Sequence, residues 1–465
     1  MSGFDPAVVA ESCGGTWYAD ALPSRLTGFS QDTRRLQKGD CFVALVTDSR
    51  DGHDFLEAAK EAGASSVLVS QPFSNFSLPQ LCVPDTLIAF QKIARYHRQA
   101  FSGKVIGVTG SCGKTTTKEL TATLLGEGVL KTEGNLNNFI GVPLTLTRLD
   151  QSTHHFGVVE AGINEPGEMD TLAQMIEADV AICTMVGEAH LEKLGSVEGV
   201  AREKSRLGEL ARPGAPMLFP AQCLRYPEFR RFGARAWVAA PPGSDLPEGN
   251  FNRLNYKTEP NEEGGCRLKI ESAALVPGIY DLPVSSPGLV SDAVLAITAT
   301  RLCGISEKDI QVRLKQWKLG KHRGDWINLG QCLIYDDCYN ANPSSIAEAL
   351  AAFVSRSANE QSRLFILGGM KELGDESQAL HEKVGRNLPV REEDRVVFIG
   401  NEAEGYLTGL KASGFPVSSV EVFATALDAV DSVKNFCGSV FLKGSRAYAL
   451  EQLLECFSEE KEVSC

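Results

Sequence analysis

One segment, residues 105–125, constrains the fold of this chain more than any other. The apolar run VIGV leads into the glycine-rich turn TGSCGKTT, and a helical pattern follows in which Leu120 and Leu124 are four residues apart. A buried strand that passes through such a turn into a helix is typical of α/β proteins with a parallel sheet. The turn leaves backbone N–H groups free at the start of the helix, where they can bind phosphate oxygens.

The turn therefore predicts a nucleoside-triphosphate site. We expect Lys114 to neutralise the β- and γ-phosphate oxygens and the Thr115 hydroxyl to reach Mg²⁺. The general pattern G-x-x-x-x-G-K-[ST] is not fully met, because Val108 stands where its first glycine would be. A chance glycine-rich turn is the structural alternative, and Cys112 is either a spectator or a source of thiol sensitivity. The predicted phosphate-binding residues are Gly110, Ser111, Cys112, Gly113, Lys114, Thr115 and Thr116.

Two further strand patterns lead to polar side chains. The apolar run 156–159 ends at Glu160, and the run 178–183 is followed by His190. Ligands bind beyond the carboxyl ends of parallel strands, so both side chains are expected near the phosphate loop. A carboxylate and a neutral imidazole at that place indicate Mg²⁺ coordination beyond Thr115. Taken singly, the glutamate reads as a salt bridge or cap and the histidine as structural.

Length and charge limit the class of protein. A chain of 465 residues is too long for one ordinary core and predicts two to four domains. The formal net charge of -13 argues against a nucleic-acid partner, which would favour a basic surface. No run approaches ~18 apolar residues, and the N-terminus lacks a signal-peptide pattern. The 13 scattered cysteines indicate reduced thiols, so we expect a cytoplasmic protein without membrane insertion.

Alternating strand and helix patterns divide the chain into three α/β blocks. The expected domains are residues 1–102, 103–319 and 320–465. In the central block, the polar stretch Pro241–Gly265 predicts turns with a small β elaboration. The strands and helix expected in the outer blocks are Cys41–Leu45, Phe55–Ala62 (helix), Ser66–Val69, Cys332–Tyr335, Leu364–Leu367, Arg395–Ile399 and Ser439–Leu442.

The order of motifs in the central block resembles the Mur ligase family. The motifs are TGSCGKTT, GNLNNFIGVPLTL (134–146), VVEAGINEPGEM (158–169) and GEAHLEKLGSVEGVAREKSRL (187–207). The resemblance implies catalytic roles for Lys114, Glu160, His190 and Lys204. It also implies two Mg²⁺ ions held by Thr115, Glu160, His190 and a CO₂-derived carbamate on Lys204. Read without the family, Lys204 is simply a solvated helical lysine.

The third block resembles the part of the family that contacts ATP from the C-terminal domain. The resemblance assigns that contact to Arg323, Asp337 and Asn340. Otherwise the acidic turn would be a helix cap, with Pro343 and Ser344 at the helix start. The sequence DCYNANP, residues 337–343, resembles the branch that joins D-alanyl-D-alanine to UDP-N-acetylmuramoyl-tripeptide. The segments LGGMKELG (367–374) and KGSR (443–446) resemble further family motifs.

The first block resembles the UDP-sugar-binding domain of the same family. It carries SQDTR (30–34), CFVAL (41–45) and DGHDF (51–55). Contacts with the UDP-sugar and its peptide are therefore expected at Ser30, Arg34, His53, Asn137 and Asn138. One stretch departs from the family, because residues 286–292 lack the histidine and asparagines usual near adenine. Adenine recognition is thus expected from Asp292 or from backbone groups.

The resemblance implies a three-domain architecture and a reaction. The expected domains are an N-terminal UDP-sugar-binding α/β domain, a central P-loop ATPase-like parallel sheet and a C-terminal Rossmann-like α/β domain. The expected protein is a monomeric ATP- and Mg²⁺-dependent amide ligase that works through an acyl phosphate. Three alternatives stay open: a folylpolyglutamate synthase or another Mur branch, a regulatory ATP-binding protein without ligase activity, and an inactive relative.

Overall fold

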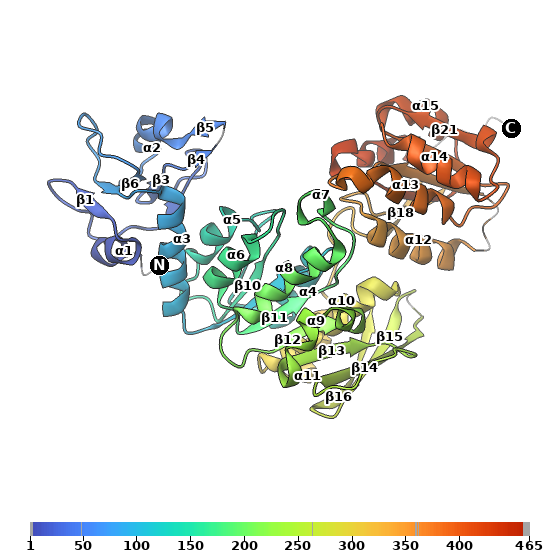
Figure 1. Cartoon of the computed structure of the whole chain (residues 1–465), viewed down its shortest axis with the longest axis horizontal. Helices are drawn as coiled ribbons and strands as arrows, with labels where there is room; N and C mark the ends of the chain where they lie inside the picture. Colours follow the sequence, from blue (N-terminus) through green and yellow to red (C-terminus); the bar gives the residue numbers. More distant parts are fainter. Residues whose placement is uncertain (1–2, 48, 263, 359, 361, 459–465) are drawn as a thin grey trace.

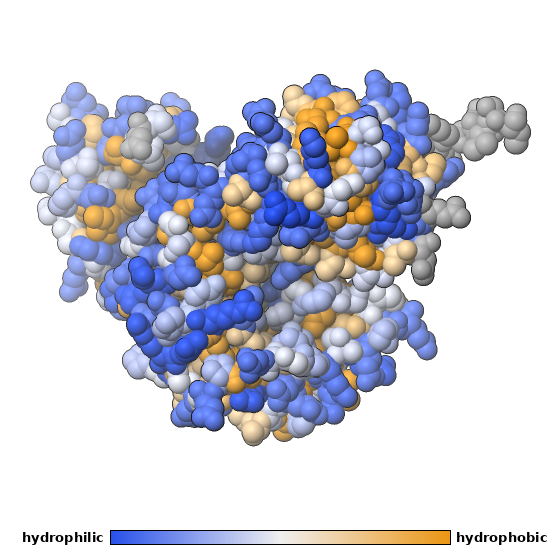
Figure 2. All heavy atoms as spheres, turned by 45° about the vertical axis from the view of Figure 1, so that its right-hand side comes forward, coloured by the Kyte–Doolittle hydropathy of each residue, from blue (hydrophilic) through white to orange (hydrophobic). Residues whose placement is uncertain are grey.

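The computed structural model describes residues 3–458 apart from 48, 263, 359 and 361. Its three main β-sheets follow one another along the chain, and Figure 1 shows each in its own lobe. We call these the N-terminal, central and C-terminal lobes. Figure 2 shows a notch between the two outer lobes, above the central one. Among the described residues, none of the helices combines the length and apolar character needed to cross a bilayer.

The N-terminal lobe has a five-stranded sheet in the order β1-β7-β6-β3-β2. Its neighbouring strands are parallel except for β1 and β7. The strand–helix–strand order predicted for this block is confirmed. Its elements are α1 (Pro6–Cys13), β1 (Thr16–Tyr18), β2 (Phe29–Ser30), β3 (Cys41–Val43), β4 (Val46–Thr47), β5 (Arg50–Asp51), α2 (Leu56–Glu61), β6 (Ser66–Val69), β7 (Gln80–Cys82) and α3 (Thr86–Ala100).

Helix α3 joins this lobe to the next. It packs against α1 of its own lobe and against α5 (Gly141–Leu146) and α6 (Glu168–Ile176) of the central lobe. The guanidinium of Arg98 is fully buried there, 2.7 Å from Asp179 Oδ2, and donates to the Ile176 carbonyl at 2.8 Å. A buried charge that is paired and hydrogen-bonded in this way fixes the junction between the two lobes.

The central lobe is built on a nine-stranded sheet in the order β16-β15-β14-β13-β12-β11-β8-β10-β9. The strands from β14 to β9 are parallel. Besides α5 and α6, its elements are β8 (Lys104–Thr109), α4 (Lys114–Leu125), β9 (Val129–Lys131), β10 (Phe156–Glu160), β11 (Val180–Cys183), α7 (Leu191–Leu194), α8 (Val197–Glu209), β12 (Met217–Pro220), α9 (Pro227–Arg230), β13 (Ala236–Ala240), α10 (Pro287–Leu302) and α11 (Glu307–Leu314).

The predicted β elaboration is present but extends further along the chain. It consists of β14 (Asn252–Pro260), β15 (Cys266–Ser272) and β16 (Leu275–Leu282), with antiparallel pairing from β14 to β16. Turns occupy only the parts of Pro241–Gly265 outside β14. Along β15 the buried and more exposed positions alternate, so one face packs on the core and the other faces solvent.

The C-terminal lobe contains a six-stranded sheet in the order β17-β18-β22-β19-β20-β21. Only β17 runs antiparallel to its neighbour. The four strands predicted here are confirmed. The elements are β17 (Asp325–Leu329), β18 (Cys332–Asp336), α12 (Pro343–Ser357), β19 (Arg363–Gly368), α13 (Ser377–Arg386), β20 (Arg395–Ile399), α14 (Ala403–Ala412), β21 (Val420–Phe423), α15 (Val430–Val433) and β22 (Gly438–Lys443).

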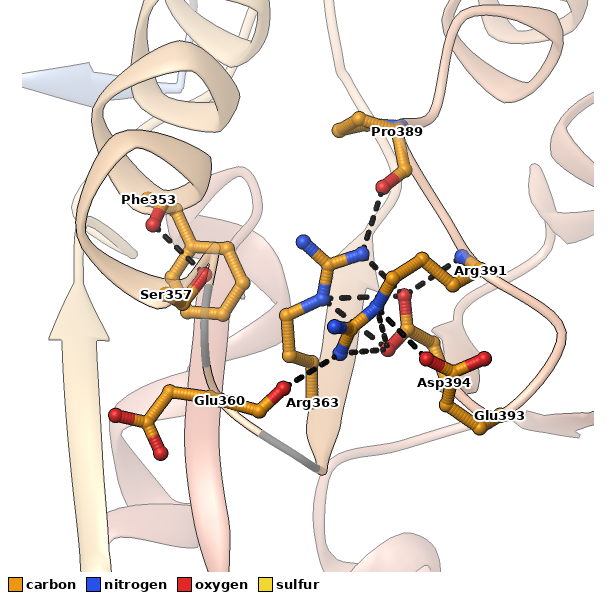
Figure 3. Close-up of polar contacts among 8 residues, drawn as sticks. All are labelled: Phe353, Ser357, Glu360, Arg363, Pro389, Arg391, Glu393 and Asp394. Carbon is orange, nitrogen blue, oxygen red and sulfur yellow. Dashed lines mark hydrogen bonds and ion pairs between the residues drawn. The ribbon is translucent and has the colours of Figure 1, made fainter.

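An ion cluster lies at the starts of β19 and β20, and none of its residues lines a cavity described below. Figure 3 shows Arg363 and Arg391 converging on Asp394. Arg363 Nε donates to both carboxylate oxygens at 3.1 Å, and the backbone N–H of Arg391 donates at 2.7 Å. The Nη2 group of Arg363 pairs with the same carboxylate and also donates to the carbonyl of Pro389 at 2.9 Å. The cluster is therefore buried and well satisfied.

Candidate active site

A cavity of about 440 Å³ lies between the P-loop and the C-terminal lobe, and we call it the central cavity. The central lobe supplies one wall and the C-terminal lobe supplies the other. Gly110 and Lys204 are outside its lining. The residues predicted to bind nucleotide or metal that do line it are Ser111, Cys112, Gly113, Lys114, Thr115, Thr116, Glu160, His190, Arg323, Asp337 and Asn340.

The P-loop joins the end of β8 to the start of α4. Gly113 has φ 79°, and a Cβ added there would lie 2.4 Å from an oxygen of Asp292, so this tight turn requires glycine. Lys114 begins the helix and its Nζ donates to the carbonyl of Gly110 at 2.7 Å. The first residues of α4, Lys114 to Thr116, line the cavity, and helix geometry leaves their N–H groups without intrahelical partners.

The carboxylate of Glu160 lies directly beside this helix start. Strand β10 pairs in parallel with β8, and Glu160 is in register with Val108. The Thr115 hydroxyl is 3.1 Å from Glu160 Oε2, and Asn137 Nδ2 donates to Oε1 at 2.9 Å. Glu160 is only 2% exposed, and Lys118 Nζ is 3.9 Å away. The predicted meeting of threonine hydroxyl and carboxylate is present, and such oxygen donors suit Mg²⁺.

His190 faces the C-terminal lobe. Its backbone is left-handed, with φ 55°, and its Nδ1 lies 2.6 Å from Oε2 of Glu372. The bond from His190 lowers the pKa of Glu372, so that carboxylate accepts and Nδ1 donates. The Nε2 atom of a neutral ring then keeps its lone pair for another ligand.

The interpretation of Lys204 as a solvated lysine is wrong. It lies on α8 and is 1% exposed, because this face of the helix packs against the sheet. Burial lowers the pKa of Lys204 to about 7, and the positive charge of Lys114 adds to the effect. A substantial share of its amine is therefore neutral near neutral pH.

On the opposite wall, the carboxylate of Asp337 pairs with Lys443 at the end of β22. Lys443 Nζ also donates to the carbonyl of Asn340 at 3.2 Å. Burial raises the pKa of Asp337, against the opposing effect of Lys443. The guanidinium of Arg323 stacks over the ring of Tyr339 at 3.9 Å.

The helix that follows this turn is capped by Asn342, and Asp337 does not cap it. Asn342 Oδ1 accepts from the backbone N–H of Ser345, and the Ser345 hydroxyl reciprocates in a capping box. Asp337 lies too early in the turn to cap and is held by Lys443. Pro343 does begin the helix, as predicted. Asn342 Nδ2 also reaches the carbonyl of Ser111 at 3.4 Å, so the cap touches the P-loop.

Two cavity residues were missed from the sequence as site residues. Lys443 ends an apolar strand, so the strand-end rule that found Glu160 could have found it. Glu348 lies within α12 and carries no such signal; burial raises its pKa. Burial raises the pKa of Asp292 well above its ordinary value, and the negative charge of Glu348 raises it further. Asp292, which the sequence suggested as an adenine contact, lines the cavity beside Gly113.

A second cavity, of about 960 Å³, lies between the N-terminal and central lobes, and we call it the N-terminal cavity. Ser30 and Arg34 line it, together with Arg35 and Arg148. Arg34 is 83% exposed along its side chain and pairs with Asp32 at 2.7 Å. Asn135 lines both cavities, so they adjoin there.

Three predicted substrate contacts have different surroundings. His53 lies outside both linings, with its ring nitrogens bonded to Asp51 at 2.6 Å and to the N–H of Ser70 at 3.0 Å. Asn137 and Asn138 line the central cavity. The side-chain oxygen of Asn138 accepts from the N–H of Gly141 at 2.9 Å at the start of α5. His53 is thus tied to local structure, because both of its nitrogens are engaged.

Two family models match the chain in the lobes that form the central cavity. The one described as "Mur ligase middle domain" matches residues 108–239. The one described as "Mur ligase, glutamate ligase domain" matches residues 322–446.

Similar proteins cover almost the whole chain. UDP-N-acetylmuramoyl-tripeptide--D-alanyl-D-alanine ligase from Escherichia coli (strain K12) is 32% identical over 448 residues, which cover 93% of this chain and 94% of that protein. The protein of the same name from Bacillus subtilis (strain 168) is 30% identical over 442 residues, with 92% of each covered.

Solved structures agree. A crystal structure of MurF from Acinetobacter baumannii has a TM-score of 0.85 and 27% identity and covers 99% of this chain and 100% of that one. MurF ligase from Thermotoga maritima in complex with ADP has a TM-score of 0.75 and 26% identity, covering 93% and 97%. The predicted three-lobed α/β architecture is therefore confirmed.

Proposed function

This chain belongs to the Mur ligase family, and we propose that it joins D-alanyl-D-alanine to UDP-N-acetylmuramoyl-tripeptide at the expense of ATP. The products are UDP-N-acetylmuramoyl-pentapeptide, ADP and phosphate, as a step in the synthesis of peptidoglycan precursors. One observation carries the proposal: a P-loop on one lobe faces Asp337 and Lys443 of another across a single cavity. Relatives of nearly full coverage carry the name of this ligase.

ATP binds in the central cavity. The N–H groups at the start of α4 and the Lys114 amine hold its phosphates. Thr115 and Glu160 are placed to hold one Mg²⁺, because their oxygens already lie 3.1 Å apart. His190 Nε2 and a carbamate on Lys204 are assigned to a second. Bound Mg²⁺ neutralises charge on the phosphate oxygens.

The reaction proceeds in two transfers. A carboxylate oxygen of the tripeptide attacks the γ-phosphorus, the bond to the β–γ bridging oxygen breaks, and ADP leaves. The D-alanyl-D-alanine amine then attacks the acyl carbon, phosphate leaves, and the amine loses a proton to solvent or phosphate. Lys114 offsets the repulsion between the two anions in the first transfer. The apposed C-terminal lobe limits water, which would otherwise hydrolyse the acyl phosphate.

The N-terminal cavity receives the UDP-sugar. Arg34, Arg35 and Arg148 supply positive charge for a diphosphate, and the adjoining Asn135 leads toward the central cavity. A long substrate can thereby place its nucleotide in one cavity and its peptide carboxylate in the other. Asn137, which holds Glu160, and Asn138 are assigned to the peptide end.

The domain division at residues 102 and 319 is part of the proposal. Helix α3 ends at Ala100 and the next sheet starts at Lys104, while α11 ends at Leu314 and β17 starts at Asp325. We place the reaction in the cytoplasm, where ATP and the UDP-linked precursor occur together, and assign it to a monomer. Sedimentation at several protein concentrations tests the monomer.

ADP release tests the proposed reaction. Purified protein with ATP and Mg²⁺ is given each substrate alone and both together, and the product is identified by mass spectrometry. We expect ADP only when both substrates are present, with the pentapeptide as product. Release with a folate and glutamate instead, or release that needs no acceptor, contradicts the assignment.

The carbamate has its own test. The neutral Lys204 amine attacks CO₂ to give a carbamate and a proton, and the lowered pKa of Lys204 to about 7 favours that neutral form. With ¹³CO₂, a carbamate resonance is expected in the wild type and in Lys193→Ala, whose lysine is 52% exposed. It should be missing from Lys204→Ala. A fully active Lys204→Ala enzyme in CO₂-depleted buffer removes this part of the proposal.

A further inference from the structure

Three side chains of metal-binding type meet on the far side of the C-terminal segment that lines the central cavity. They are His322, Asp336 and Cys338, and one ligand atom of each lies within 4.8 Å of the others. His322 Nδ1 is 2.7 Å from Asp336 Oδ2, and Cys338 Sγ donates to Oδ1 at 3.1 Å. Among the residues that the structure describes, no other group of three or more such side chains approaches so closely.

The backbone sets this arrangement. Strand β18 ends at Asp336, and in the turn that follows it Asp337 and Tyr339 line the cavity while Asp336 and Cys338 do not. The Tyr339 N–H donates to the carbonyl of His322 at 3.1 Å, which holds the two ends of the cluster together. His322 has φ 61°, a left-handed conformation that a non-glycine residue adopts at some cost in free energy.

We propose that His322, Asp336 and Cys338 form a binding site for one divalent cation of the zinc class. A thiolate with an imidazole selects Zn²⁺, Co²⁺ or Cd²⁺ over Mg²⁺, which prefers oxygen ligands. In a tetrahedral zinc site the ligand atoms would be roughly 3.3–3.5 Å apart, so the three here, which lie within 4.8 Å of one another, would have to shift by roughly an ångström. Cys338 is fully buried and Asp336 is 4% exposed, which protects such a site from competing water.

One further carboxylate, that of Glu451, affects the cluster electrostatically. Glu451 pairs with Arg446 through Oε1, while its Oε2 is buried with no hydrogen-bond partner among the described residues. Its negative charge acts on the Cys338 thiol. A water molecule, or Glu451 after a movement of its side chain, would complete a tetrahedral set.

Binding of the cation releases one proton and neutralises its charge. The thiol loses its proton to solvent as sulfur binds the ion, and the bond from sulfur to Asp336 is replaced. His322 binds through Nδ1, with any ring proton on Nε2. The thiolate and the Asp336 carboxylate together match the two positive charges of the ion. Since Asp337 follows directly, the ion would fix the back of the nucleotide wall.

Cobalt spectroscopy on the full-length protein tests the site. Chelator-stripped protein in saturating Mg²⁺, which fills oxygen-ligand sites, is titrated with Co²⁺. We expect a thiolate-to-cobalt band in the near ultraviolet that saturates at one equivalent and disappears on adding Zn²⁺. Cys338→Ser and His322→Gln should abolish the band or weaken Co²⁺ binding by at least about tenfold.

Two controls separate this thiol from others. Cys332→Ser removes a buried thiol at the start of β18, the strand that ends at Asp336, and Cys112→Ser removes the P-loop thiol; both should keep the band. A wild type without the band, or a band that survives Cys338→Ser, overturns the proposal. If the variants unfold by circular dichroism, X-ray absorption of the zinc-loaded wild type decides: one sulfur ligand supports the site, and only nitrogen and oxygen ligands refute it. None of these results depends on the ligase assignment.

Discussion

The pKa values of two aspartates of the C-terminal lobe, Asp394 and Asp337, are shifted in opposite directions. Burial alone would raise the pKa of both. At Asp394 the hydrogen bonds from Arg363 and Arg391 outweigh burial, and the pKa falls below its ordinary value. At Asp337 the single Lys443 does not outweigh burial, and the pKa is raised. The charge of Asp394 is fully compensated by two arginines (Figure 3), which suits a structural role. The charge of Asp337 is only partly compensated and lies at the cavity wall, where contacts with a ligand can add to it.

The largest effect is expected from breaking the cluster around Asp394. Asp394→Ala leaves Arg363, which is 2% exposed, without its carboxylate. Removing one partner of a buried ion pair typically costs about 3–5 kcal/mol of unfolding free energy. Urea unfolding followed by circular dichroism measures the change, with the exposed Asp431→Ala as control. Equal stability of the two variants would mean that the cluster does not stabilise this lobe.

Removing the P-loop cation should change catalysis and leave folding intact. Lys114→Ala is expected to lower kcat by at least about 100-fold, or about 2.7 kcal/mol, as for other preorganised charges. Steady-state ADP release measures it, with Lys257→Ala, an exposed lysine on β14, as the matched control. Near-normal turnover would remove the phosphate role of Lys114.

Neutralising the incompletely compensated aspartate should separate binding from stability. Asp337→Asn keeps the side-chain shape and an acceptor oxygen for Lys443, so we expect a smaller loss of unfolding free energy than in Asp394→Ala, below about 3 kcal/mol without ligand. The KM for ATP should rise by about tenfold if the carboxylate contacts the nucleotide, which corresponds to about 1.4 kcal/mol. A large loss of stability with an unchanged KM would instead make Asp337 a structural residue like Asp394.

The smallest expected effect is in the pH dependence of stability, which should have opposite signs at the two sites. The Asp394 contribution is present above the unfolded pKa, about 3.9, and is lost as pH falls through the lower folded pKa. The Asp337 contribution is present below that pKa and is lost as pH rises through the higher folded pKa. Unfolding midpoints of wild type, Asp394→Asn and Asp337→Asn from pH 3 to pH 7 measure both slopes. If the unfolding midpoints of both variants depended on pH in the same way, the two aspartates would not differ as described.

Local patterns predicted the parts of the site that depend on neighbouring residues. Lys114 and Thr115 follow from a glycine turn between strand and helix, and Glu160 follows from the end of the next parallel strand. The first rule acts within one strand–loop–helix unit, and the second needs only that parallel strands end at the same edge of a sheet.

The remaining features depend on contacts between segments far apart in the chain. Lys204 is buried because its helix packs on the central sheet, and Glu348 reaches the cavity only because two lobes meet. His53 could not be separated from a ligand contact until Asp51 and the Ser70 amide were seen to occupy its ring. Such packing leaves no periodic signal in the sequence.

The pair formed by His190 and Glu372 couples the geometry of a proposed metal ligand to the position of the C-terminal lobe. Glu372 comes from the C-terminal lobe, and its carboxylate at 2.6 Å fixes which ring nitrogen of His190 carries the proton. When the lobes separate, that carboxylate leaves, the imidazole can rotate, and either tautomer becomes available. In the proposed reaction, closure of the C-terminal lobe would therefore orient the His190 ring for the metal only once Glu372 is in place.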